Sequence, residues 1–162
     1  MSTPSGCSGT TGARRGFRIM PPTLLLGLLV ACVGVALALP TRSLDPWPFN
    51  FLGVAVIAAG IVLNLRSDRQ LKVAKTTVKP DERPSVLVIG GSFRLTRNPM
   101  YLGMALILAG AAITMGSLIA VVCAALFVVV VDRWFIRNEE RNASEAFGRA
   151  YAEYRRKVRR WL

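Results

Sequence analysis

The feature that most constrains the fold is a run of 31 residues, 101–131, that contains no charged side chain. As one continuous α-helix this run would be about 46 Å long at 1.5 Å per residue, whereas the hydrocarbon core of a bilayer is about 30 Å thick. The run is therefore too long for one membrane span and must turn. Residues 114–117, which include Gly116, are the best place for the turn. We expect two close-packed spans, with Gly103 and Gly110 letting the backbones approach each other.

Two further apolar runs precede this one, at Pro22–Leu39 and Trp47–Leu65. Each is long enough to cross a bilayer, and the short, turn-forming connection Thr41–Pro48 predicts that they form a helical hairpin. Trp47 is placed as an interfacial anchor. With 52% apolar residues in a chain of 162, the predicted fold class is an all-α, multi-pass integral membrane protein with about four transmembrane helices.

The first apolar run also resembles a targeting signal. Basic residues precede it, and Leu29–Cys32 looks like a lipoprotein cleavage site. A cleaved leader normally ends at its small-residue site, but here apolar sequence continues to Leu39 and further runs follow, which favours a membrane span. Residues 1–21, rich in Ser, Thr and Gly and ending in arginines, are predicted to form a disordered basic arm.

The positions of the cations predict the orientation in the membrane. With four spans, 20 of the 21 Lys and Arg residues lie on one side, and Arg42 lies on the other. Cytoplasmic loops concentrate Lys and Arg, so residues 66–97 are predicted to be a cytoplasmic connection and both termini to be cytoplasmic, in a bacterial inner membrane. A net charge of +12 would suggest nucleic-acid binding in a soluble protein, but these cations flank apolar runs instead of forming one face.

The C-terminal residues 137–162 have the pattern of a basic amphipathic helix on the cytoplasmic side, broken near Gly148. Its apolar and aromatic residues recur at steps of three and four. They are Ala146, Phe147, Tyr151, Tyr154, Val158 and Trp161. The basic segment Arg155–Arg160 is expected to contact anionic lipid headgroups.

The absence of histidine excludes several kinds of active site. Without imidazole the chain has no Ser/His/Asp or Cys/His nucleophilic site and lacks the commonest metal ligand. The three cysteines show no CxxC spacing, so no metal site is predicted. Any chemistry must therefore use other side chains.

Two polar clusters flank the predicted hairpin 98–136. Residues 97–103 stand at the start of its first helix, and Arg137 with the Glu139-Glu140 pair follows its second helix. The hairpin would bring both clusters to one face of the membrane. Asn98 suits an N-cap and Pro99 the first helical position, so that free N–H groups at this helix start favour an anion.

These clusters, together with Phe147-Gly148-x-x-Tyr151-x-x-Tyr154, resemble the isoprenylcysteine carboxyl methyltransferase family, which is grouped with membrane phospholipid methyltransferases. The resemblance covers residues 79–162. It implies that S-adenosylmethionine is bound between the last two membrane helices, in residues 98–136, and the tail that completes the site, residues 137–162. Asn98 stands where the family motif has histidine, and asparagine cannot titrate near neutral pH.

The resemblance implies roles for individual residues. Arg97 would pair with the α-carboxylate of the cofactor, and Glu139 or Glu140 would accept hydrogen bonds from its ammonium or ribose. Tyr101 would face the sulfonium or stack on the adenine. Arg97 and Tyr101 are the candidate catalytic residues, and no metal is expected. The full set of expected cofactor-binding residues is Arg97, Asn98, Pro99, Tyr101, Gly103, Arg137, Glu139 and Glu140.

A purely structural interpretation of the same residues remains open. Arg133 or Arg137 would then pair with the glutamates, Tyr101 would belong to an aromatic belt, and Gly103 would serve only helix packing. The favoured function is a membrane methyltransferase acting on a lipophilic or lipid-embedded carboxylate, amine or thiol. The alternative is a non-enzymatic scaffold that binds anionic lipids or a partner protein. Transport is disfavoured because no span has an ionisable residue at its middle.

Overall fold

The computed structural model describes residues 21–38, 50–75 and 86–162. Within these ranges all the regular elements are helices, and there is no strand. The elements are α1 (Pro21–Ala38), α2 (Asn50–Val73), the 3₁₀-helix η1 (Gly91–Arg94), α3 (Pro99–Met115), α4 (Leu118–Val130), the π-helix η2 (Val131–Ile136) and α5 (Arg137–Lys157).

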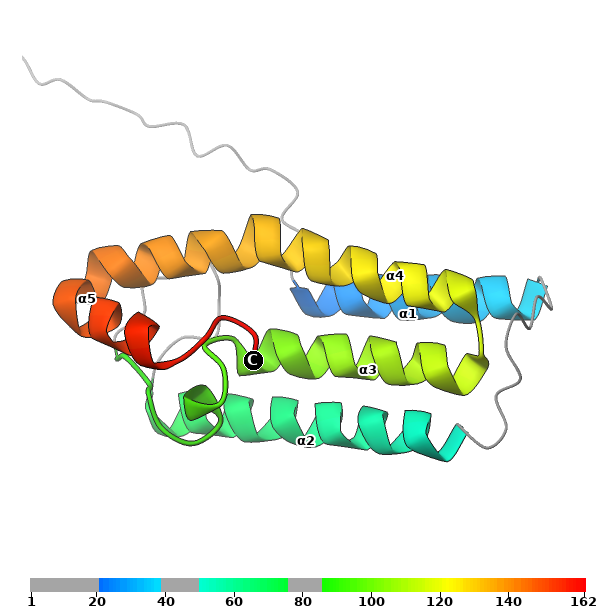
Figure 1. Cartoon of the computed structure of the whole chain (residues 1–162), viewed down its shortest axis with the longest axis horizontal. Helices are drawn as coiled ribbons and strands as arrows, with labels where there is room; N and C mark the ends of the chain where they lie inside the picture. The colour runs from blue at the N-terminus through cyan, green and yellow to red at the C-terminus, as the bar shows by residue number, and fades with distance from the viewer. Residues whose placement is uncertain (1–20, 39–49, 76–85) are drawn as a thin grey trace, which may run out of the picture.

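The four helices α1 to α4 lie side by side, and α5 continues from α4 beyond them before it bends back (Figure 1). The beginnings of α1 and α3 and the ends of α2 and α4 point toward the end of the molecule where α5 lies. We call this end, formed by residues 66–75, 86–98 and 132–162, the polar end. The turn between α3 and α4 lies at the opposite end.

The long apolar run turns where the sequence predicts it. Gly116 ends α3 with φ 57° and donates its N–H to the Ile113 carbonyl. Ser117 caps α4, and its hydroxyl accepts the Ala120 N–H at 3.5 Å. A left-handed glycine followed by a serine cap stops one helix and begins the next, so the prediction of two helices in this run is confirmed.

The closest helix packing joins α2 to α3 through two pairs of glycines. A Cβ on Gly60 would lie 2.6 Å from the Gly103 carbonyl oxygen, and a Cβ on Gly53 would lie 2.8 Å from that of Gly110. Gly103 and Gly110 therefore do allow a close approach, but the expected partner was wrong, because they face α2 and not α4. Small residues let two backbones meet wherever they face each other, and sequence spacing does not say which helix that is.

Helix α1 packs against α3 and α4, with Leu25, Leu28 and Leu29 against their buried core. The predicted hairpin of the first two helices is therefore not a packed pair. Helix α2 also extends eight residues beyond Leu65, because residues 66–73 contain no glycine or proline to stop it. The first part of the predicted connection 66–97 is thus helical.

Two helices in the described part of the chain are long and apolar enough to cross a membrane. They are α2 and the continuous helix Leu118–Lys157, while α3 is apolar but shorter at 17 residues. Only 17% and 22% of their apolar windows are buried, and large side chains such as Phe51, Leu65 and Val122 are exposed. Apolar helices exposed on this scale suit a lipid environment better than water.

Several predictions fall on residues 1–20 and 39–49, outside the described residues. These are the disordered arm, the connection Thr41–Pro48, the interfacial Trp47 and the placement of Arg42.

Candidate functional site

The start of α3 lies against the C-terminal residues of the chain. Asn98 occupies the N-cap position and Pro99 the first position of the helix, as predicted. The Asn98 side chain does not cap the helix, however. Its Nδ2 donates to the Arg160 carbonyl oxygen at 3.2 Å, and the Thr96 hydroxyl donates to the same oxygen at 2.7 Å.

An ion pair between Arg97 and Glu140 joins the segment that precedes α3 to α5. Arg97 Nη2 lies 2.8 Å from Glu140 Oε1, and the side chains are only 9% and 10% exposed. Arg160 also binds Glu140, through Nη2 to Oε2 at 2.6 Å and through Nε to Oε1 at 3.2 Å. The partners of Glu140 are therefore Arg97 and Arg160. The structural interpretation, which paired Arg133 or Arg137 with Glu139 or Glu140, is wrong for Glu140.

Asp132 extends this ion pair into a chain of four charges. It follows α4 in the π-helix η2, a turn that recurs at functional sites because one extra residue rotates the helix that follows. Its carboxylate accepts from Arg160 Nη1 at 3.3 Å and from the indole N–H of Trp161 at 3.1 Å. The neighbouring Arg133 and Trp134 are exposed.

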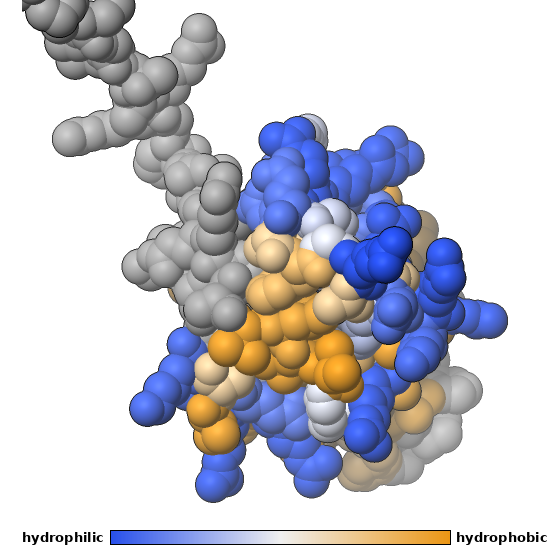
Figure 2. All heavy atoms as spheres, turned by 90° about the vertical axis from the view of Figure 1, so that its left-hand side faces the viewer, coloured by the Kyte–Doolittle hydropathy of each residue, from blue (hydrophilic) through white to orange (hydrophobic). Residues whose placement is uncertain are grey.

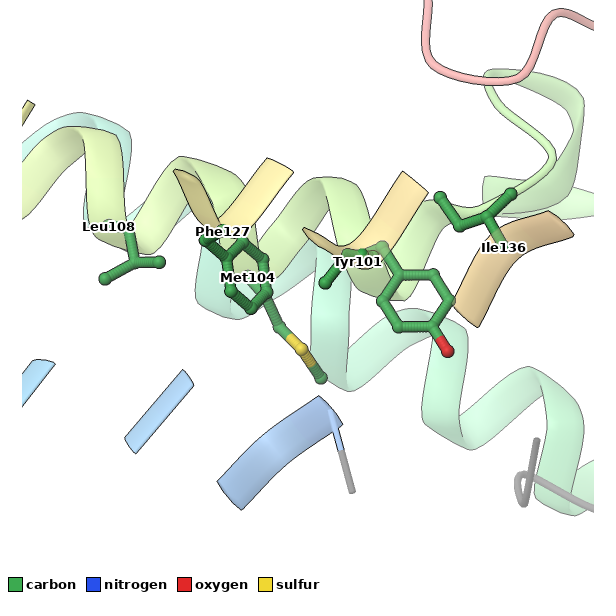
Figure 3. Close-up of a cluster of buried hydrophobic side chains, with 6 residues drawn as sticks. Tyr101, Met104, Leu108, Phe127 and Ile136 are labelled. Carbon is green, nitrogen blue, oxygen red and sulfur yellow. The ribbon is translucent and has the colours of Figure 1, made fainter. Parts of the chain in front are cut away.

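A second contact between α3 and α5 is the hydrogen bond from the Tyr101 hydroxyl to Glu139 Oε1. Figure 3 shows Tyr101 beside Met104, with Leu108, Phe127 and Ile136 in the same apolar cluster. Tyr101 is only 6% exposed. It therefore belongs to the core, with its hydroxyl at the polar end, and is not part of a lipid-facing aromatic belt.

One donor in this region lacks a partner. Among the described residues, Arg97 Nε is the buried side-chain nitrogen or oxygen without a hydrogen bond. An unsatisfied buried N–H costs free energy unless a ligand or water accepts its hydrogen. Arg97 is thus equipped to bind an acceptor in addition to Glu140.

The structure brings together Arg97, Asn98, Pro99, Tyr101, Glu139 and Glu140, from the start of α3 and the start of α5. It places the two other predicted residues differently. Gly103 lies against the Gly60 carbonyl of α2, and Arg137 is exposed.

The sequence interpretation missed Asp132, Arg160 and Trp161. Asp132 carried a usable signal, since it is the only acidic residue within 98–136 and directly follows an apolar run. Arg160 was assigned to lipid headgroups with the rest of the basic segment. That assignment was wrong for Arg160, because its guanidinium contacts two carboxylates of the protein.

Helix α5 is kinked at Gly148, which has φ 49°, as the sequence predicts. Beyond the kink, the Tyr154 hydroxyl donates to the Phe93 carbonyl oxygen at 2.6 Å and ties α5 to η1. Burial raises the pKa of Tyr154 to about 12, and burial followed by the charge of Glu140 raises the pKa of Tyr151 to about 12. The helix ends at Lys157. The prediction that Val158 and Trp161 belong to the amphipathic helix is therefore wrong.

The kink opens a surface depression of about 380 Å³ on α5. Its lining combines small residues with hydroxyl and guanidinium groups: Ser144, Gly148, Tyr151, Ala152, Arg155 and Arg156. At this end of the molecule an apolar area is surrounded by hydrophilic side chains (Figure 2). The polar end thus offers both apolar and cationic surface.

Comparison with known sequences identifies the family. Residues 49–150 match the phospholipid methyltransferase family, which is related to the isoprenylcysteine carboxyl methyltransferases. The chain belongs to the phospholipid methyltransferase family. The resemblance inferred from the sequence motifs is therefore confirmed. Membership implies methyltransferase activity, with S-adenosylmethionine as the methyl donor general to the family.

The matched region includes α2, α3, α4 and the paired residues Arg97, Tyr101, Glu139 and Glu140, but ends before Arg160. An uncharacterized protein of Haemophilus influenzae is 36% identical over 63 residues, which are 39% of this chain and the whole of that relative. No solved structure matches the chain.

Proposed function

We propose that this membrane methyltransferase binds S-adenosylmethionine at the polar end and methylates a lipophilic or lipid-embedded acceptor. The observation that carries the proposal is the meeting of two side-chain pairs, Arg97 with Glu140 and Tyr101 with Glu139, beside an apolar cluster. A cofactor with charged and apolar parts needs both kinds of surface in one place.

The residues present fit the groups of the cofactor. The unpartnered Nε of Arg97 suits its carboxylate, and the carboxylates of Glu139 and Glu140 suit its ammonium and ribose hydroxyls. The ring of Tyr101, in the apolar cluster, suits the sulfonium or the adenine.

When bound, the cofactor supplies an electrophilic methyl group. The protein needs only to align donor and acceptor and to exclude water, so neither histidine nor a metal is required. Met104 and Phe127 form an apolar wall beside Tyr101, and low polarity favours a transfer that discharges a sulfonium. Asn98 orients the C-terminal segment, because its side-chain amide donates a hydrogen bond to the Arg160 carbonyl oxygen. This role does not require a titratable group.

The proposal includes four membrane spans, with the hairpin 98–136 and the tail 137–162 forming the cofactor site. Residues 22–65 contribute the first two spans, and both termini lie with the connection 66–97 on the cytoplasmic side of a bacterial inner membrane. The alternating direction of α1 to α4 supports this topology. Each of these helices has one end next to a basic segment of the sequence, and these four ends lie on the same side of the molecule.

Anionic lipid headgroups are the proposed partners of the depression on α5. Arg155 and Arg156 line it, and both are exposed. Guanidinium groups bind phosphate through two parallel hydrogen bonds, and basic segments beside a membrane attract anionic lipids. The scaffold hypothesis rests on this same surface but assigns no role to the buried Arg97.

Calorimetric titration of the detergent-solubilised protein with S-adenosylmethionine or S-adenosylhomocysteine tests the proposal. We expect binding, and we expect Arg97→Met to weaken it by about tenfold or more, because a charge-assisted contact is lost. Arg160 would still satisfy Glu140 in this variant, so the melting temperature should change little.

Arg141→Met is the matched control, since Arg141 is exposed on α5 and, among the described residues, forms a surface ion pair with Glu145. No binding by the unaltered protein at millimolar cofactor would contradict the enzymatic function. Equal affinities of the Arg97→Met variant and the unaltered protein would contradict the proposed site.

A further inference from the structure

Residues 158–161, which follow α5, make hydrogen bonds within the polar end. Past the end of α5 the backbone turns back to the start of α3, where the Arg97 N–H donates to the Arg159 carbonyl oxygen at 3.0 Å. The Arg160 carbonyl accepts from Thr96 and Asn98. These contacts use backbone carbonyls, so the Arg160 side chain is available to bind other groups.

The guanidinium of Arg160 binds Glu140 more completely than Arg97 does. Arg160 uses two nitrogens, Nε and Nη2, and reaches both carboxylate oxygens of Glu140. Arg97 makes one contact, from Nη2 to Oε1. The Nε of Arg97 remains buried and has no partner in the described part of the chain.

Asp132 holds Arg160 in this position. It contacts Nη1 of Arg160 through both carboxylate oxygens, at 3.3 and 3.4 Å, and also accepts the Trp161 indole N–H. The hydrogen bonds and ion pairs to these two carboxylates raise the pKa of Arg160, so its charge is permanent. The side chain of Asp132 is 20% exposed and that of Arg160 31% exposed, so water screens these charges only in part.

We propose that Arg160 is a positioning residue that enables Arg97 to bind the carboxylate of the cofactor. Because Arg160 takes the two-point contact with Glu140, the remaining donors of Arg97 are available to a second carboxylate. This inference rests on the proposed function and concerns a residue that lies beyond the part of the chain matched by the family.

The charge balance gives the same result. Arg97, Arg160, Asp132 and Glu140 together sum to zero charge. Without Arg160 the cluster would carry one negative charge, and Glu140 would be left with Arg97 as its partner. A ligand carboxylate would then face both repulsion and a competitor for Arg97, whereas the adenosine part of the ligand would be unaffected.

The test compares two ligands that differ only in the carboxylate. S-adenosylhomocysteine has the carboxylate. Decarboxylated S-adenosylhomocysteine lacks the carboxylate but keeps the amine and the nucleoside. Calorimetry measures both affinities for the unaltered protein, for Arg160→Met, and for Arg159→Met. Arg159 is the matched control because its side chain is exposed, and its carbonyl contact to Arg97 is retained in the variant.

We expect Arg160→Met to weaken S-adenosylhomocysteine about tenfold and the decarboxylated ligand less than about twofold, which is a selective loss of one charge-assisted contact. Arg159→Met should leave both affinities unchanged. If Arg160→Met does not fold, Arg160→Lys decides, because it keeps the charge but not the two-point contact. It should give a smaller loss with the same selectivity.

Equal losses for both ligands would mean that Arg160 is merely structural, and no loss would mean that it is dispensable; either result overturns the inference. Failure of the unaltered protein to bind either ligand would instead overturn the proposed function. The two failures are therefore distinguishable.

Discussion

At the scale of single residues, the polar end is held together by groups that lose water on folding. Glu140 is 8% exposed and is stabilised by two guanidiniums, since a buried carboxylate left without any partner would be costly. Tyr151 and Tyr154 are 5% and 7% exposed beside this cluster. Their hydroxyls remain protonated to unusually high pH because burial disfavours the phenolate.

These tyrosines predict how the protein responds to alkaline pH. The folded pKa of each, about 12, lies above the ordinary tyrosine value of 10.0. The folded state thus keeps protons that the unfolded chain would release, so their stabilising effect is complete below about pH 10 and is lost as the pH rises toward 12. In a Tyr101→Phe variant the phenolate absorbance reports only on these two residues, because the chain has three tyrosines.

We expect this absorbance to stay flat through pH 10 and to rise either near pH 12 or together with unfolding. Circular dichroism monitors the unfolding. A phenolate transition centred at pH 10 in the folded protein would show that the two hydroxyls are not buried as described.

At the scale of helices, the position of the site depends on the contact between α2 and α3. Gly53 and Gly60 on α2 face Gly110 and Gly103 on α3, and the Asn64 amide continues the contact by donating to the Met100 carbonyl at 3.2 Å. This contact fixes the start of α3, where Arg97 and Asn98 lie. At the other end of the site, the π-helix η2 sets the direction in which α5 presents its glutamates.

Gly60→Ala should destabilise the protein by about 1–3 kcal/mol, the usual cost of overpacking, because its methyl group would meet the Gly103 carbonyl oxygen at 2.6 Å. Thermal unfolding in detergent measures the change. Gly27→Ala on α1 is the control, since no described atom outside the adjoining backbone of α1 itself lies within 4 Å of the Cβ it would add. Equal melting temperatures for the two variants would contradict the close contact between α2 and α3.

At the scale of the whole molecule, the helices alternate in direction, and α3 and α4 form a hairpin with its turn far from the polar end (Figure 1). If the proposed four spans are correct, this turn and α5 lie on opposite sides of the membrane.

Cysteine labelling in spheroplasts tests this arrangement. In a background without Cys7, Cys32 and Cys123, Leu118→Cys at the exposed turn should react with a maleimide that cannot cross membranes. Arg149→Cys, exposed on α5, should react only after the membrane is permeabilised. Reaction of both cysteines from the same side would contradict the four-span topology.

Much of the architecture followed from local properties of the chain. The absence of charge over residues 101–131, with Gly116 and Ser117 inside the run, predicted a turn that the structure confirms. Pro99 at a helix start and the kink at Gly148 were also predictable locally, because proline has a fixed φ that suits the first helical position and glycine readily adopts a positive φ. The family resemblance came from motifs of equally short range.

The sequence by itself therefore determined the helical character of the chain, the limits of α3 at Pro99 and Gly116, and the family. Only the tertiary structure decided which surfaces meet: that Gly103 faces α2, that α1 packs against α3 and α4, and that Arg160 reaches Glu140 and Asp132. The physical reason is that helix formation and capping depend on residues a few positions apart. A glycine or an arginine, by contrast, can meet any complementary surface that the fold brings within reach.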